Sequence, residues 1–101
     1  MENITVQELK RRRDAGEQLH IVDVREADEV AEFNIGATHI PLGNILSFQL
    51  GDLEDWKEEE VILHCRSGKR SAQAGLMLET MGFTKVKNLE GGMLAWQEAI
   101  K

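Results

Sequence analysis

Short apolar runs alternate along this chain with stretches of helical periodicity. The clearest apolar run covers residues 61–65, with acidic residues before it and a glycine-containing turn after it. Continuous apolar runs of this length are typical of strands in parallel sheets, because helices cover both faces of such sheets. The alternation therefore predicts an α/β domain with a largely parallel sheet.

Caps and turn residues predict where the elements begin and end. Thr5 followed by Glu8 forms a capping box, and Asn44 is expected to cap a later helix. Gly82 followed by Phe83 indicates a helix that ends in a Schellman motif. Both ends of the chain look loose. The expected helices cover residues 6–15, 26–33, 44–50, 69–81 and 93–100, and the expected strands cover 19–24, 38–41, 61–65 and 85–89.

Length and charge limit the classes of function. A chain of 101 residues favours one domain over residues 1–101. Its net charge of −6 argues against nucleic-acid binding, and the basic run at 10–13 is expected to be a solvated helix face. Residues 65–71, in contrast, hold three basic side chains and no acid, so the segment carries +3 and the remainder −9. A local positive site on an acidic protein indicates a small anionic ligand.

The single cysteine excludes a disulfide within the chain and a zinc site built on cysteines, and we expect no metal. The first residues have no basic start or apolar run of signal-peptide length, and no stretch approaches the roughly 20 apolar residues of a membrane helix. We therefore expect a soluble cytoplasmic protein without a membrane partner, in a compartment where a free thiol persists.

Cys65 lies where the predicted sheet would place a ligand site, beyond the carboxyl end of its clearest strand. The loop from 66 to 70 contains Gly68 and precedes a helix, so its N–H groups can converge on one point. A helix N-terminus and nearby cations both lower the pKa of a thiol. The alternative is an inert buried cysteine with ordinary surface charges around it. Three cations within five residues favour the functional interpretation.

The histidines look structural. His64 adjoins Cys65, but successive side chains of a strand point to opposite faces, so the two are not expected to act as a pair. His20 and His39 lie in strand-like runs, and Trp56 and Trp96 are expected to pack in the core or at its rim.

The loop resembles the active-site loop of the rhodanese family of sulfurtransferases, in which a cysteine, two residues, glycine, any residue and arginine follow one another. Cys65, Gly68 and Arg70 fit this pattern without a gap. The resemblance covers residues 4–100. Three further segments agree in family order: Asp-Val-Arg-Glu at 23–26, Ile-Pro-Leu at 40–42 and Leu-Glu-Gly-Gly-Met-Leu-Ala-Trp at 89–96.

The resemblance implies a rhodanese-like α/β domain, with a central, mostly parallel five-stranded sheet and helices on both faces. It implies Cys65 as the catalytic nucleophile, a thiosulfate-like anion as sulfur donor, and cyanide, a thiol or a sulfur-carrier protein as acceptor, in a monomer without cofactor. Asp23 and Arg25 are expected to be structural partners, with a role for Arg25 at the site left open. The residues expected to bind the substrate are Arg66, Ser67, Gly68, Lys69 and Arg70.

Three questions stay open on sequence alone. The segment Asn34-Ile35-Gly36 is similar to the corresponding segment of rhodanese domains that are fused to enzymes activating sulfur-carrier proteins. This similarity leaves the sulfur acceptor undecided. A phosphatase or arsenate reductase is the enzymatic alternative, although such phosphatases have one residue more between cysteine and arginine. The alternative from another class is a persulfide relay or a regulatory module without turnover. Arg70 could either face the substrate or brace the loop.

Overall fold

The computed structural model describes residues 1–100 and contains one sheet with the strand order β1–β5–β4–β2–β3. All four strand pairs are parallel. The sequence predicted a mostly parallel sheet, and the sheet is entirely parallel. The strands are β1 (Glu2–Ile4), β2 (His20–Asp23), β3 (Thr38–His39), β4 (Glu60–His64) and β5 (Lys85–Leu89).

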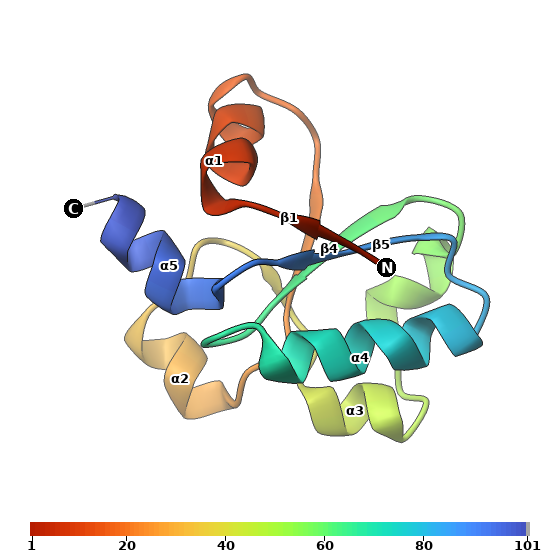
Figure 1. Cartoon of the computed structure of the whole chain (residues 1–101). Helices are drawn as coiled ribbons and strands as arrows, with labels where there is room; N and C mark the ends of the chain where they lie inside the picture. Colours follow the sequence, from red (N-terminus) through yellow and green to blue (C-terminus); the bar gives the residue numbers. More distant parts are fainter. Residues whose placement is uncertain (101) are drawn as a thin grey trace.

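Helices cover both faces of the sheet, as Figure 1 shows with the sheet seen close to its edge. α1 packs beside α5 on one face, and α3 packs beside α4 on the other. α2 lies below α5 in this view, beside the start of α4. The helices are α1 (Val6–Asp14), α2 (Ala27–Glu32), α3 (Leu42–Leu46), the 3₁₀ helix η1 (Gly51–Trp56), α4 (Lys69–Thr80) and α5 (Gly92–Ala99).

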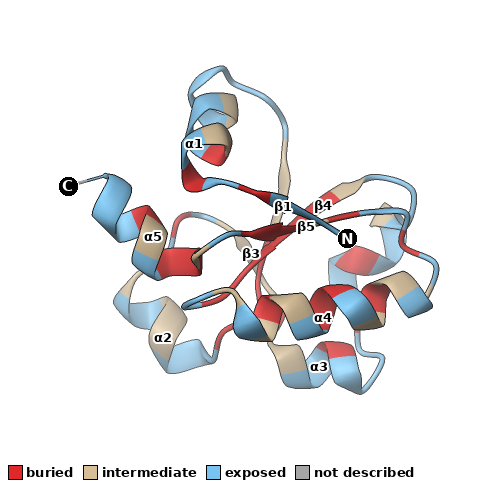
Figure 2. Cartoon of the chain, in the orientation of Figure 1, coloured by how far each residue is buried: buried red, intermediate tan, exposed pale blue. Residues whose placement is uncertain are grey.

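The core is divided by the sheet into two apolar clusters, and the central strand β4 between them is almost entirely buried (Figure 2). Val61, Leu63 and Cys65 belong to the cluster under α3 and α4. Ile62 belongs to the cluster under α1 and α5. Because side chains alternate along a strand, His64 points away from Cys65, as the sequence predicted.

Two local predictions were wrong. Helix α3 begins at Leu42 with Pro41 as its N-cap, so Asn44 lies inside the helix and does not cap it. Residues 2–4 are not loose but form β1, which pairs with β5. A three-residue strand is too short to show a period of its own, and its partner is distant in sequence. The Schellman ending of α4 is confirmed, since the Phe83 N–H donates to the Leu78 carbonyl at 3.1 Å.

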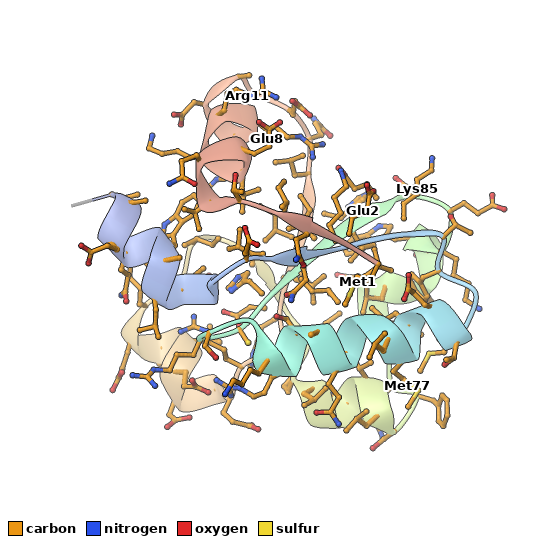
Figure 3. The ribbon with its side chains drawn as sticks, in the orientation of Figure 1. Met1, Glu2, Glu8, Arg11, Met77 and Lys85 are labelled. Carbon is orange, nitrogen blue, oxygen red and sulfur yellow. The ribbon has the colours of Figure 1, made fainter. Side chains whose placement is uncertain are left out.

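The basic run at 10–13 lies on α1, and three of its four side chains pair with acids. Arg11 pairs with Glu8 on the outer side of α1 (Figure 3), and Lys10 pairs with Asp14. Arg12 contacts Glu17 and Glu60. The cations are therefore neutralised locally, which agrees with a solvated helix face. Within residues 1–100 no helix combines the length and the apolar composition needed to span a membrane.

Candidate active site

Cys65 directly follows the central strand β4, and α4 begins four residues later. Gly68 caps α4 with a φ of +101°, a left-handed conformation that L side chains rarely adopt. This conformation turns the Gly68 N–H back toward the cysteine, where it donates to Sγ at 3.1 Å. The glycine in the predicted loop thus has a specific task, which is to aim one amide at the sulfur.

The sulfur lies beneath the loop, since Cys65 is only 1% exposed. The Ser71 hydroxyl, from the first turn of α4, lies 3.4 Å from Sγ. Burial raises the pKa of the Cys65 thiol, but hydrogen bonds from the Ser71 hydroxyl and from the amides of Ser71, Gly68 and Ser67 outweigh it, so the pKa is lowered. Cys65 is thus buried, with hydrogen-bond donors directed at its sulfur.

Asn88 is a site residue that the sequence analysis missed. It lies on β5 in register with Leu63, two residues before Cys65, so its side chain is on the same face as the sulfur. Its Nδ2 donates to the Gly68 carbonyl at 3.0 Å, and its Oδ1 accepts from the Ser71 hydroxyl at 2.5 Å. Only the pairing of β5 with β4 brings Asn88 to the loop, and no sequence motif marks it.

Helix α5 holds the other side of the loop. The Met93 N–H donates to the Cys65 carbonyl at 2.9 Å, and the Leu94 N–H donates to the Arg66 carbonyl at 3.0 Å. Gly92 makes this approach possible, because a Cβ there would lie 2.7 Å from the Arg66 carbonyl carbon. The two amides at the start of α5 therefore fix the backbone on which the sulfur is carried.

The predicted substrate-binding residues have three different surroundings. Arg66, Ser67 and Lys69 are exposed, whereas Gly68 contacts the sulfur through its amide. Arg70 extends to α2 instead, where its guanidinium donates to both carboxylate oxygens of Glu29 at 2.6 and 2.8 Å. This pair holds the pKa of Glu29 down at about 2. Arg70 therefore ties the start of α4 to α2.

A hollow of about 180 Å³ lies beside the loop, between α2 and α5. Arg66 contributes its basic group, and Phe33 and Leu94 contribute apolar surface. A larger hollow of about 420 Å³, between the start of α1 and α5, contains no residue of the loop. The small hollow is thus the cavity that adjoins the predicted chemistry.

Asp23 and Arg25 form a buried ion pair at the end of β2, as the sequence predicted. The Arg25 guanidinium donates to Asp23 Oδ2 at 2.8 Å and to the Phe33 carbonyl at 2.5 Å. Removing one member of such a buried pair costs about 3–5 kcal/mol, because the other charge stays buried without a partner. The pair therefore fixes the segment that leads into α2, and it makes no contact with the Cys65 sulfur.

His64 is fully buried on the opposite face of β4, and its ring nitrogens have no hydrogen-bond partner among the described residues. Burial lowers its pKa to about 4, although Asp23, 3.8 Å away, opposes the effect. His20 stacks on Trp56 with ring centroids 4.0 Å apart, and His39 bonds the Arg25 carbonyl. All three histidines have structural surroundings, as predicted.

Comparisons with known proteins agree with this architecture. Residues 5–99 match the model of the rhodanese-like domain family. The Bacillus subtilis protein named "Putative sulfurtransferase YtwF" is 40% identical, over all of this chain and 95% of its own. "Putative sulfur carrier protein YrkF", also from Bacillus subtilis, is 36% identical over 92% of this chain and 49% of its own. The crystal structure of a rhodanese-like domain protein from Staphylococcus aureus has a TM-score of 0.81, with 36% identity over 95% of this chain and 91% of that one.

Proposed function

The chain belongs to the rhodanese-like domain family, and from this premise we propose that it transfers a sulfane sulfur from a thiosulfate-like donor through a persulfide on Cys65. Relatives of the chain carry the name sulfurtransferase. The observation on which the proposal rests is the convergence of the Gly68 amide and the Ser71 hydroxyl on Sγ. Donors aimed at a thiol favour the thiolate, which is the nucleophilic form.

The reaction has two displacement steps. In the first, the Cys65 thiolate attacks the outer sulfur of thiosulfate, a new S–S bond forms, and sulfite leaves with the electron pair of the broken S–S bond. In the second, an acceptor thiolate or cyanide attacks the outer sulfur of the persulfide. The Cys65 thiolate is regenerated, and the acceptor leaves as a persulfide or as thiocyanate. No metal or organic cofactor enters either step.

Each part of the loop has a role in these steps. The N–H groups of residues 66–70 stabilise the charge on the outer sulfur of the persulfide. Arg66, exposed at the hollow, and Lys69, exposed at the start of α4, attract the sulfonate oxygens of the donor. The near-complete burial of Cys65 favours a donor that presents a single terminal sulfur to the loop.

The geometry gives less support to phosphate chemistry. Only four residues separate Cys65 from Arg70, and both ends of the Arg70 guanidinium are paired with Glu29. In a loop of this size, the arginine that a phosphatase loop would direct at a tetrahedral phosphate is held instead by a carboxylate of α2. A phosphomonoester assay is expected to give no activity that depends on Cys65.

Mass spectrometry after incubation with thiosulfate tests the proposal. The chain has one cysteine, so a mass increase of about 32 Da that cyanide removes assigns the persulfide to Cys65, because oxidation of cysteine or methionine to the same mass is not reversed by cyanide. Discharge of the adduct by cyanide or thiols is expected to restore the original mass. Cys65→Ser is expected to form no adduct and no thiocyanate, and thiocyanate formation by that variant would refute the assignment. An adduct that discharges without steady-state turnover would indicate a persulfide relay.

A further inference from the structure

The Ser71 hydroxyl lies within reach of two buried acceptors. Cys65 Sγ is 3.4 Å from Ser71 Oγ, and Asn88 Oδ1 is 2.5 Å from it. Asn88 cannot exchange its roles, because its Nδ2 donates to the Gly68 carbonyl and its Oδ1 therefore faces Ser71. Since a serine hydroxyl has a single proton, it satisfies only one of these acceptors fully at a time.

The two protonation states of the sulfur make opposite demands on this proton. When Cys65 is a thiol, the S–H can donate to Ser71 Oγ while Ser71 donates to Asn88, so each of these three side chains has a hydrogen-bond partner. When Cys65 is a thiolate, the sulfur accepts hydrogen bonds only, and the Ser71 proton has to turn toward it. Asn88 Oδ1 is then left without its donor, which is costly in a buried position.

We propose that the Ser71 hydroxyl is a two-position hydrogen-bond donor, and that Asn88 is a positioning residue which competes with Cys65 for its proton. This inference deepens the proposed function, on which its role in the cycle rests. In the free protein the proton turns to Sγ and stabilises the nucleophile. In the persulfide the charge lies on the outer sulfur, Sγ is bonded and neutral, and the proton returns to Asn88. Ser71 and Asn88 thus exchange only a hydrogen bond, and the two displacement steps are unchanged.

Other charged groups surround the sulfur, but they are constant in the comparison that tests this idea. Arg66 and Lys69 lie in the loop and at the start of α4, and Arg70, which feels the charge of Cys65, is paired with Glu29 of α2. The buried Asp23–Arg25 pair at the end of β2 and the uncharged His64 ring of β4 lie on the face of the sheet opposite the sulfur. No variant proposed below changes any of these groups.

The composition of the chain offers a direct readout of the thiol. Thiolates absorb in the far ultraviolet where thiols do not, and the chain has one cysteine and no tyrosine, so no phenolate interferes. Ser71→Ala removes a donor and is expected to raise the midpoint of this titration. Asn88→Leu removes the competing acceptor at similar size and is expected to lower it. Each shift should be up to about one pH unit.

Opposite shifts from two hydrogen-bonded partners are not expected from structural damage, which would move both midpoints toward that of a free thiol. In a Ser71→Ala background, Asn88→Leu should no longer lower the midpoint, because Asn88 competes through the hydroxyl, and any shift that remains there measures the lost Nδ2 bond to the Gly68 carbonyl. Ser47→Ala is the matched control, since its hydroxyl bonds the Gly43 carbonyl on α3, and its midpoint should equal that of the unsubstituted protein. Asn88→Ala provides a second variant if the leucine does not fold.

The unsubstituted protein supplies an independent measurement. The side-chain amide carbon of Asn88, followed by NMR, should change its resonance with the same midpoint as the thiolate absorbance. An Asn88 resonance that stays constant through the titration, or a raised midpoint in a folded Asn88 variant, would overturn the proposal. Both experiments are equilibrium titrations without a sulfur donor, so their outcome is separate from whether the protein transfers sulfur.

Discussion

Replacing Gly92 with alanine tests whether the close approach of α5 holds the loop that carries Cys65. Gly92 is buried at the first position of α5 with a φ of +56°. A Cβ at this position would lie 2.7 Å from both the carbonyl carbon and the oxygen of Arg66, and it would also collide with the Cys65 carbonyl oxygen. These are backbone atoms, so they can yield only if the whole loop moves.

The cost has two parts that a second glycine separates. A left-handed conformation costs a non-glycine residue about 1–2 kcal/mol. Forcing an extra carbon into a packed region adds about 1–3 kcal/mol. Gly82 has a φ of +98°, but a Cβ there would meet no atom within 4 Å, so Gly82→Ala carries the first cost alone. Gly92→Ala should therefore lower the free energy of unfolding by about 2–5 kcal/mol, and Gly82→Ala by about 1–2 kcal/mol.

Urea unfolding measures both variants, and the rate of thiocyanate formation from thiosulfate measures their effect on the loop. Gly92→Ala is expected to lose activity even without urea, where the variant is folded. The reason is that the amides of Met93 and Leu94 can no longer donate to the loop carbonyls in the same geometry. Gly82→Ala should retain the full rate per folded molecule. Equal losses of stability, together with an unchanged rate for Gly92→Ala, would refute the reasoning.

The remaining predictions concern Arg66, Arg70 and the buried His64. Arg66→Ala should raise the KM for thiosulfate about tenfold with little change in stability, because an anion contact of about 1.4 kcal/mol is lost. Arg70→Ala should instead lower the free energy of unfolding by up to about 1 kcal/mol, because its pair with Glu29 is lost. Steady-state kinetics and urea unfolding measure the two effects, and a KM effect at Arg70 with a stability effect at Arg66 would contradict the assignment. Because burial lowers the pKa of His64 from 6.5 to about 4, the unfolded chain binds its proton first, so stability is complete above pH 6.5 and falls by about 3 kcal/mol as the pH drops to 4. His64→Phe should flatten this part of the pH profile, and an unchanged slope would contradict it.

Much of the fold could be predicted from the sequence because its strongest signals are local. β4 is buried on both faces, so it appears in the sequence as an unbroken apolar run. The end of α4 depends on Gly82 and Phe83, which are adjacent. The elements that escaped prediction lack such signals. β1 depends on its pairing with β5, and η1 is a short 3₁₀ helix without apolar periodicity.

The candidate site divides in the same way. Cys65 and Gly68 could be identified because the strand, loop and helix that contain them are continuous in sequence. The partner of Arg70 could not, since Glu29 lies 41 residues earlier in the chain. Asn88 could not be identified either, because its place beside the loop depends on β5 being the neighbour of β4. Contacts that cross the sheet order require the tertiary structure.

The reactivity proposed for Cys65 therefore depends on groups that the loop alone does not contain. Burial by itself would raise the pKa of this thiol and leave an inert core cysteine. The donors that reverse this effect have to be held in place, and two elements outside the loop hold them: α5 through its first amides, and α2 through Glu29. A short loop grafted without these elements would keep the cysteine and its cations. It would lose the aimed hydrogen bonds, and we expect its thiol to titrate like that of an ordinary cysteine.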